Sequence, residues 1–266
     1  MTSTRTLIIG LDGATFDLID PLIESGELPT LKSIIAEGVR GDLQTWPNTN
    51  SAAAWSSMVT GYNSGQHGIF HFGEAINRPG AAWRPLIGAD RRKDAFWRIL
   101  SNAGQSIGVV NVPITYPAEQ IKGFMIAGMD APGTRSNGFA HPSGLMADLS
   151  KHGIEYVIDV PNLGRESERD RYRLPPAVER LIQTRAQTVL HLMRTRDWDA
   201  LMAVFVATDR VQHYYWPPEG SPADSPDWNP IRRVYQLIDL FLEQVLSAID
   251  SNTTLLLVSD HGFGPE

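Results

Sequence analysis

The sequence predicts a layered α/β/α fold, with helices on both faces of a mainly parallel central sheet. Its short apolar runs are rich in Val, Ile, Leu and Met and do not alternate, which is typical of strands buried on both faces. These runs cover residues 6–11, 106–112, 123–128, 200–207 and 254–259. Helix-like segments separate them, and strands that alternate with helices build right-handed βαβ units in an open sheet.

Amphipathic periodicity predicts the helices between these strands. We expect them at residues 17–24, 29–37, 94–102, 176–196 and 231–249. Gly26, Gly38 and Gly104 follow three of these segments, as expected for glycines that end helices. Segment 137–173 is rich in Gly, Pro, Ser and charge, with one strand-like run at 154–160. We interpret it as a loop-rich insertion or cap near the site, within a single α/β domain that spans residues 1–266.

Composition excludes several classes of function. The chain has 266 residues, no cysteine and a net charge of −7. The absence of cysteine excludes disulfides, thiolate zinc sites and cysteine nucleophiles. The acidic balance argues against a nucleic-acid polymer as partner. Since we identify neither a signal peptide nor an apolar run long enough to span a bilayer, we expect a cytoplasmic protein without membrane contact.

Polar side chains follow the predicted strands. The strands lead into Asp12, Asn111, Asp130, Asp209 and Asp260. In open α/β sheets, ligands bind beyond the carboxyl ends of the strands, so these groups are candidates for an active site. Taken singly, an Asp after a strand is equally well explained as a helix cap or a turn residue.

Two Asp/His pairs are candidate metal ligands. Asp209 and His213 are spaced i, i+4, which places both side chains on one face if a helix begins there. Taken alone, such spacing more often marks an ordinary surface pair. Asp260 and His261 follow the last strand and precede two glycines, Gly262 and Gly264. Carboxylate and imidazole ligands together suit zinc, manganese or a similar divalent ion.

Ser51 stands where a loop leads into a predicted helix that ends near Gly61. The simpler reading is that Ser51 caps this helix with its hydroxyl oxygen. The alternative is a nucleophile: the helix N-terminus attracts phosphate oxygens, and a neighbouring metal lowers the pKa of a hydroxyl. The local sequence favours the cap.

Taken together, several segments resemble the alkaline-phosphatase superfamily, in its type I phosphodiesterase/nucleotide pyrophosphatase branch. The closest similarity is to bacterial proteins described as phosphohydrolases or phosphomutases. The order and spacing of the segments carry the resemblance, which extends along the whole chain and is weakest in 137–173. The segments are LDGATFD (11–17), residues 51–61 leading to QHGI (66–69), NVPITYP (111–117), TDRVQH (208–213) and SDHGFG (259–264).

The resemblance implies an alkaline-phosphatase-like fold and two divalent metal ions. One metal would be held by Asp12, Ser51, Asp260 and His261, with Ser51 as the nucleophile. The other would be held by Asp209 and His213, with a further histidine towards the C-terminus. We expect zinc, with manganese as the alternative.

Two departures from the family pattern stand out. Ala54 replaces an Asn that in eukaryotic nucleotide pyrophosphatases helps to hold a phosphate oxygen. The family normally continues beyond the position of Glu266, so we expect a truncated member with little activity of its own. The last histidine ligand would then be missing unless His141, His152 or another chain supplies it.

The expected function is metal-dependent hydrolysis of a small phosphate ester or diester through a covalent phosphoseryl-type intermediate. A phosphomutase of the same superfamily and a non-catalytic metal- or phosphate-binding domain remain the alternatives. A sulfatase is disfavoured because Ser51 does not stand in the Cys/Ser-x-Pro-x-Arg context of that branch.

Overall fold

The computed structural model describes residues 4–45, 49–75, 83–160, 168–217 and 225–264. Its centre is a six-stranded sheet in the order β6-β5-β4-β7-β1-β8. The strands are β1 (Arg5–Leu11), β4 (Ile107–Val110), β5 (Gly123–Ile126), β6 (Ala140–His141), β7 (Ala200–Phe205) and β8 (Thr253–Val258). The pairs are parallel except that β6 runs antiparallel to β5. The predicted mainly parallel sheet is therefore confirmed.

The position of each strand in the sheet explains its sequence pattern. Every residue of β4 and β7 is buried, because these strands lie inside the sheet and helices cover both faces. In β8, which forms one edge, more exposed residues such as Leu256 alternate with less exposed ones. The continuous apolar runs thus mark central strands, as expected for a parallel sheet.

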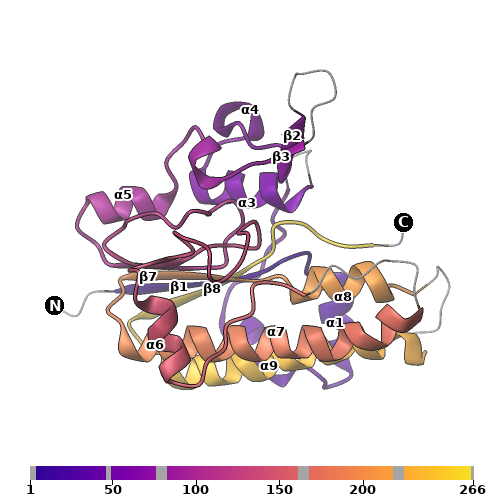
Figure 1. The fold of residues 1–266 in the computed structure, drawn as a ribbon. Helices are drawn as coiled ribbons and strands as arrows, with labels where there is room; N and C mark the ends of the chain where they lie inside the picture. Colours follow the sequence, from indigo (N-terminus) through magenta and orange to yellow (C-terminus); the bar gives the residue numbers. More distant parts are fainter. Residues whose placement is uncertain (1–3, 46–48, 76–82, 161–167, 218–224, 265–266) are drawn as a thin grey trace.

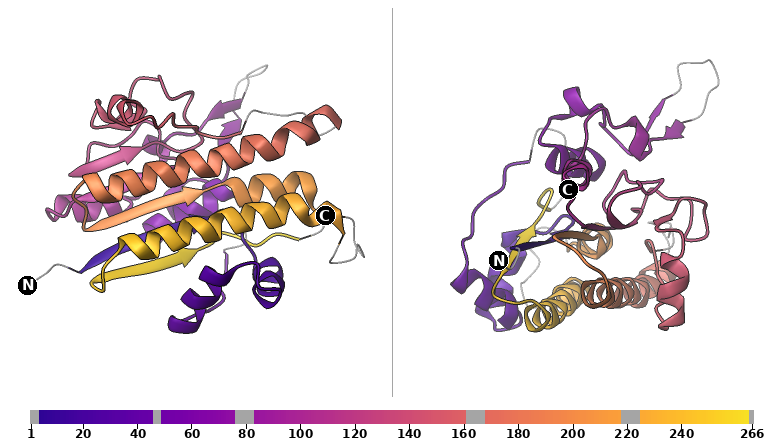
Figure 2. Two further views of the ribbon diagram at one scale, coloured as in Figure 1. Left: turned by 90° about the horizontal axis from the view of Figure 1, so that it is seen from below. Right: turned by 90° about the vertical axis from the view of Figure 1, so that its left-hand side faces the viewer.

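Helices form a layer on each face of the sheet (Figure 1). One layer contains α1 (Phe16–Glu24), α2 (Pro29–Glu37), α7 (Glu168–Thr195), α8 (Ala207–Tyr215) and α9 (Asn229–Ala248). Figure 2 shows α7 and α9 lying side by side across the sheet. The short turn η2 (Pro226–Trp228) precedes α9. None of the described helices combines the length and hydropathy that a bilayer crossing requires.

The opposite layer holds the candidate nucleophile. It contains α3 (Ser51–Thr60), α4 (Ser64–His67), α5 (Phe96–Asn102), the turn η1 (Gly88–Asp90) and the hairpin β2 (Gly73–Ala75) with β3 (Trp83–Pro85). Trp55 of α3 packs on Gly10 of β1, where an added Cβ would lie 2.5 Å from the Trp55 ring. The glycine therefore lets α3 approach the sheet closely.

The helix predictions hold with shifted boundaries. Helix α7 begins at Glu168 and continues through Pro175 and Pro176, whereas the pattern predicted a start at residue 176. Proline favours the first turn of a helix because it has no N–H to donate, but here it lies inside one. The predicted helix at 94–102 begins slightly later, at Phe96.

The strand expected at 154–160 is absent. Ile154 and Tyr156 are buried in the core, which explains the apolar run, yet the backbone there is irregular. Arg185 of α7 donates to the carbonyl oxygens of Val157 and Ile158, so these groups are satisfied without a neighbouring strand. The described part of segment 137–173 also includes β6 and α6 (Leu145–Lys151), which pack on the same core.

Candidate functional site

Asp12 is the buried centre of the site. It follows β1, is 1% exposed, and its backbone N–H donates to the carbonyl of Phe205 at 2.9 Å. The side chain accepts a hydrogen bond from Trp55 Nε1 to Oδ2 at 2.9 Å. Its other oxygen, Oδ1, lies 3.2 Å from Ser51 Oγ. Trp55 thus holds Oδ2 and leaves Oδ1 facing the Ser51 hydroxyl.

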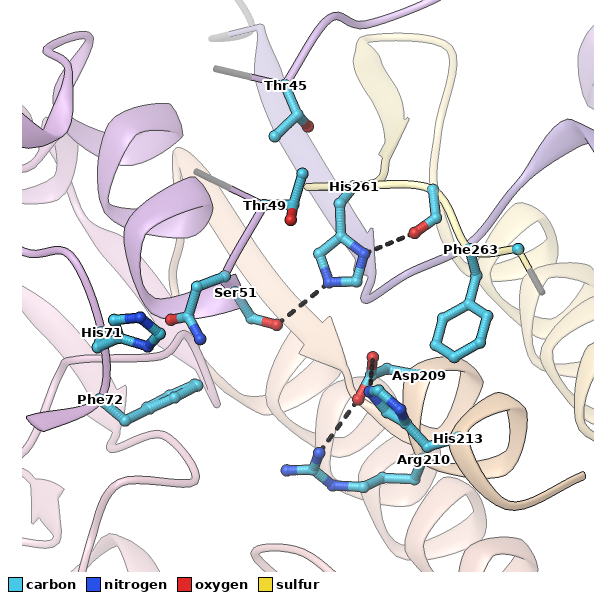
Figure 3. A pocket seen from close by; sticks show the side chains of 13 residues that line it. Thr45, Thr49, Ser51, His71, Phe72, Asp209, Arg210, His213, His261 and Phe263 are labelled. Atoms are coloured by element: carbon cyan, nitrogen blue, oxygen red, sulfur yellow. Dashed lines mark hydrogen bonds and ion pairs between the residues drawn. The ribbon is translucent and has the colours of Figure 1, made fainter. Parts of the chain in front are cut away.

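Ser51 does not cap α3. The N-cap is Asn50, whose side-chain oxygen accepts from Ala52 N at 3.2 Å. The reading of Ser51 as a helix cap is therefore wrong: its hydroxyl lies 3.2 Å from both Asp12 Oδ1 and His261 Nε2. Because a neighbouring residue does the capping, the Ser51 hydroxyl is free to face the pocket (Figure 3).

Asp260 and His261 follow β8, the strand next to β1, and lie beside Asp12 and Ser51. Strand β8 pairs in parallel with β1, with Val258 opposite Gly10, so the residues after the two strands meet at one edge. His261 Nε2 lies 3.5 Å from Asp12 Oδ1 and 3.6 Å from Asp260 Oδ2. Its other nitrogen, Nδ1, lies 2.7 Å from the carbonyl oxygen of Gly262. A proton on Nδ1 leaves the lone pair of Nε2 directed into the site.

Asp209 and His213 complete the group from α8, on the other side of β1. The i, i+4 spacing brings Asp209 Oδ1 within 3.2 Å of His213 Nε2, as predicted from the sequence. One potential ligand atom from each of Asp12, Asp209 and His261 lies within 4.8 Å of the other two. The structure therefore brings together all the site residues predicted from the sequence.

The electrostatics of the site favour a cation. Asp12, Asp209 and Asp260 are all at least nine-tenths buried. Burial, followed by the negative charge of Asp12, raises the pKa of Asp260 to about 8. Among the described residues Asp260 Oδ2 has no hydrogen-bond partner, although Gly13 N donates to Oδ1 at 3.2 Å. A buried acceptor without a donor is costly, and a bound cation would satisfy it. The donor set thus fits a divalent ion.

The negative charges of Asp12 and Asp260 also affect the pKa of His261. Burial alone would lower the pKa of His261, but its hydrogen bond to Asp12 and the charge of Asp260 raise this pKa to about 9. For Asp209, burial opposes ionisation, yet the contacts with His213 and Arg210 keep the pKa of this carboxyl below its usual value. The raised pKa of His261 indicates negative charge around this ring, whereas the lowered pKa of Asp209 reflects the positive charge of its own neighbours.

Arg210 is a pocket residue that the sequence analysis did not select. Its Nη1 donates to Asp209 Oδ2 at 3.1 Å, and its Nη2 donates to Asp159 Oδ2 at 2.7 Å. Arg210 Nε also lies 3.1 Å from each oxygen of Asp159. The only signal in the sequence was its position next to Asp209. Its partner Asp159 comes from a distant loop, so the pairing requires the tertiary structure.

These side chains border a pocket of about 790 Å³ at the carboxyl edge of the sheet. Ser51, Asp209, Arg210, His213 and His261 line it, and Asp12 and Asp260 lie beneath them. Such a volume suits a small-molecule ligand. The sequence analysis also missed several further lining residues: Thr45, Thr49, His71, Phe72 and Phe263.

His141 and His152, considered as substitutes for a further metal ligand, do not line this pocket. His141 Nε2 lies 3.1 Å from the carbonyl of Ile121 at the edge of the sheet. His152 lies at the end of α6, near Asp148. The alternative in which one of them supplies the further ligand is therefore not supported by their positions.

Comparisons with known proteins agree with this architecture. A phosphonoacetate hydrolase from Sinorhizobium meliloti superposes with a TM-score of 0.60 at 16% identity, covering 98% of this chain and 56% of that one. Murine ectonucleotide pyrophosphatase/phosphodiesterase 5 superposes with a TM-score of 0.56 at 14% identity, covering 97% of this chain and 57% of that one. A 2-O GAG sulfatase, BT1596, superposes with a TM-score of 0.58 at 11% identity, covering 98% of this chain and 58% of that one. These similarities show the shared fold, and the chain spans somewhat over half the length of each.

A curated relative matches a shorter stretch. GPI ethanolamine phosphate transferase 3 of Saccharomyces cerevisiae is 29% identical over 72 residues, which is 27% of this chain and 6% of the transferase. The protein-family model described as "Type I phosphodiesterase / nucleotide pyrophosphatase" matches residues 6–266, and this range includes the whole candidate site. The predicted resemblance is confirmed: the chain belongs to the type I phosphodiesterase/nucleotide pyrophosphatase family.

Proposed function

We propose that this chain forms the catalytic centre of a metal-dependent hydrolase of small phosphate esters or diesters, with Ser51 as the nucleophile. The observation that carries the proposal is the convergence of Ser51 Oγ with Asp12 Oδ1 and His261 Nε2, at 3.2 Å from each. Membership of the type I phosphodiesterase/nucleotide pyrophosphatase family supports the same reaction class.

The residues divide into two groups of ligands. Asp12, Ser51, Asp260 and His261 would hold one divalent ion, and Asp209 with His213 would hold another beside it. We favour zinc, with manganese as the alternative, because carboxylate and imidazole ligands suit both. When bound, the ions lower the pKa of the attacking hydroxyl and neutralise charge on the phosphoryl oxygens.

The chain itself positions the nucleophile and the phosphate. Asp12 Oδ1 accepts the hydrogen bond of the Ser51 hydroxyl, which holds Oγ towards the pocket. The N-terminus of α3 lies at the pocket and attracts phosphate oxygens through its dipole. Arg210, fixed by Asp159 and Asp209, adds positive charge to the pocket wall.

The reaction then has two displacements. Ser51 Oγ gives its proton to water and bonds to phosphorus as the bond to the leaving oxygen breaks, and that oxygen gains a proton from water. Water next breaks the phosphoseryl bond, which restores the Ser51 hydroxyl and releases phosphate or a phosphomonoester. Positioning and charge stabilisation supply most of the catalysis in phosphoryl transfer, and this constellation offers both.

The test compares Ser51→Ala with Ser51→Thr. With p-nitrophenyl phosphate and bis-p-nitrophenyl phosphate as substrates and zinc or manganese added, Ser51→Thr should retain turnover, since threonine keeps a hydroxyl. Ser51→Ala should lose nearly all turnover, by roughly 10³-fold or more, because no phosphoester can form. Intact-mass spectrometry after rapid acid quench should show one phosphoryl group on the wild type with the monoester, one p-nitrophenylphosphoryl group with the diester, and neither on Ser51→Ala.

Thermal unfolding of each variant provides the control for folding. Near-normal hydrolysis by a folded Ser51→Ala protein would exclude the covalent route and favour attack by water. Because we expect little activity of the chain by itself, the covalent adduct is the deciding result: a wild-type chain that binds metal at Asp12 but never carries the adduct would exclude the proposed route.

A further inference from the structure

A second group of metal-ligating side chains lies far from the pocket. Asp148 belongs to α6, His152 follows that helix as its C-cap, and His191 belongs to α7. Figure 1 shows α6 at the end of the molecule where β1 begins, whereas the pocket lies at the carboxyl ends of the strands. The group therefore belongs to neither of the metal positions proposed above.

The three side chains are already close to ligand geometry. One potential ligand atom from each lies within 4.8 Å of the other two. Asp148 Oδ2 is 3.8 Å from His191 Nε2, and Asp148 Oδ1 is 3.8 Å from the His152 ring at Nδ1, so this ring must turn to present Nε2 to an ion. The ligands of a tetrahedral zinc ion, with bonds of about 2.0–2.2 Å, lie roughly 3.3–3.6 Å apart. Small side-chain rotations would therefore close the site.

His191 supplies an independent reason to expect a ligand. Its side chain is 13% exposed, and Nε2 is buried without a hydrogen-bond partner in the described parts of the chain. An unsatisfied buried polar atom is destabilising, so such atoms are uncommon in folded proteins. A metal ion would use the lone pair of this nitrogen.

The neighbouring contacts hold the other two side chains in place. His152 Nδ1 lies 2.9 Å from the backbone oxygen of Asp148, so a proton on Nδ1 leaves the lone pair on Nε2. Arg196 Nη2 donates to Asp148 Oδ2 at 2.7 Å, which orients the carboxylate and leaves Oδ1 available. Hydrogen bonds of this kind commonly orient metal ligands. The His152 side chain is 54% exposed, so an ion can reach the group from solvent.

We propose that Asp148, His152 and His191 form a peripheral binding site for a divalent transition-metal ion of the zinc type. Two imidazoles and one carboxylate suit zinc, copper or nickel better than magnesium or calcium, which prefer oxygen ligands. A water molecule would complete the coordination. The ion would connect α6 to α7, and the chain after α6 leads to Asp159, the partner of Arg210 in the pocket wall.

The competing explanation is an ion-pair cluster. Here protonated histidines would lie beside the Asp148 carboxylate, with Arg196 adding to the positive charge, and no metal would bind. His152 and His191 also have ring centroids 4.5 Å apart, so two positive charges on them would repel each other. Neutral rings that share a metal avoid this repulsion, which is why we prefer the metal site.

The test is a zinc titration by isothermal calorimetry on metal-free protein at pH 7.5. The wild type should bind one zinc ion per chain more than His152→Ala. This substitution alters an exposed side chain, so the fold should be retained, and circular dichroism checks that it is. Lys151→Ala, the matched control on the same helix, should bind as many zinc ions as the wild type. His191→Gln should lose the same ion as His152→Ala.

Asp12→Asn separates this site from the pocket, because it should weaken zinc binding there and leave the peripheral zinc unchanged. A double variant, Asp12→Asn with His152→Ala, should show both the weakened zinc binding in the pocket and the loss of the peripheral zinc. Equal zinc stoichiometry and affinity in the wild type and His152→Ala would overturn the proposal in favour of the ion-pair cluster. Equal loss in Lys151→Ala would also overturn it, because the effect would then not depend on the ligands.

Discussion

At the scale of single residues, hydrogen bonding gives the Ser51 hydroxyl a different role from that of the adjacent Asn50 side chain. Asn50 caps α3, and Ser51 is thereby left to contact Asp12 and His261. Gly13 is equally specific: its φ of +65° is unfavourable for other residues, and an added Cβ would lie 3.1 Å from the His261 ring. Small differences in side-chain size and position therefore determine whether the site can assemble.

His67 illustrates a histidine with a structural role. It is fully buried, its Nδ1 accepts from Ile69 N at 3.1 Å, and its Nε2 lies 2.9 Å from Ser57 Oγ. Nδ1 must stay unprotonated to accept that bond. Burial, with a smaller effect from Arg91, lowers the pKa of His67 below its usual value. His67 therefore has a structural hydrogen-bonding role.

The lowered pKa predicts how stability depends on pH. The unfolded chain binds a proton at His67 near pH 6.5, before the folded chain does. The contribution of neutral His67 is therefore complete above about pH 6.5 and decreases as pH falls from there to the lower folded-state pKa, by at most about 1.4 kcal/mol per pH unit. Urea unfolding between pH 5 and 8 should show the wild-type advantage over His67→Gln shrinking on acidification. A constant wild-type advantage over this pH range would contradict the prediction.

At the scale of elements, a helix is capped by a residue distant in sequence. Helix α2 begins after Leu28, which has no side-chain acceptor. Asp239 of α9 supplies it instead: Thr30 N donates to Oδ2 at 3.1 Å and Leu31 N to Oδ1 at 2.7 Å. A carboxylate at a helix N-terminus satisfies free N–H groups and interacts favourably with the dipole. Asp239 thus joins α2 to α9.

We therefore expect Asp239→Ala to lower the free energy of unfolding by about 1–2 kcal/mol, as loss of an N-cap does. Asp239→Asn should cost less, because an amide oxygen still accepts one of the two N–H groups. Glu243→Ala, one turn further along α9 and exposed, is the matched control and should change stability by under about 0.5 kcal/mol. Urea denaturation measures all three. An Asp239→Ala protein as stable as the control would show that this cap is energetically neutral.

At the scale of the whole molecule, the site joins parts of the chain that are far apart in sequence. Strand β1 lies between β7 and β8, so α8 and the residues after β8 meet above Asp12. Three buried carboxylates are brought together there, and their mutual repulsion opposes folding when no cation is bound. Metal binding should therefore stabilise the fold as well as prepare the site.

Zinc should raise the midpoint of thermal unfolding of the metal-free chain. An ion present at 100 times its dissociation constant stabilises the native state by about 2.7 kcal/mol. Asp12→Asn should lose most of the increase that comes from the pocket, whereas Ser51→Ala should keep most of it because the carboxylate and imidazole ligands remain. Differential scanning calorimetry with His152→Ala as the common background isolates the pocket. An equal zinc-induced shift in Asp12→Asn would argue against Asp12 as a ligand.

Periodicity was sufficient to predict the sheet and most helices, whereas the site residues were predicted from strand-end positions together with the family resemblance. Buried strands need continuous apolar side chains, and parallel strands place their carboxyl ends at one edge, so these patterns carry structural information on their own. The boundaries of α7 and the irregular run at 154–160 were not predictable, because packing and the Arg185 hydrogen bonds override local preference.

The amino-acid sequence alone determined the family, the α/β architecture and the identity of the residues that converge on Asp12. Only the tertiary structure decided what each of them contacts. It showed that Asn50 rather than Ser51 caps α3, that Arg210 pairs with Asp159, and that Asp148 and His152 lie beside His191. The physical reason is the same in each case: hydrogen bonds and ion pairs act over about 3–4 Å, and sequence spacing specifies positions at that precision only within one helix or strand.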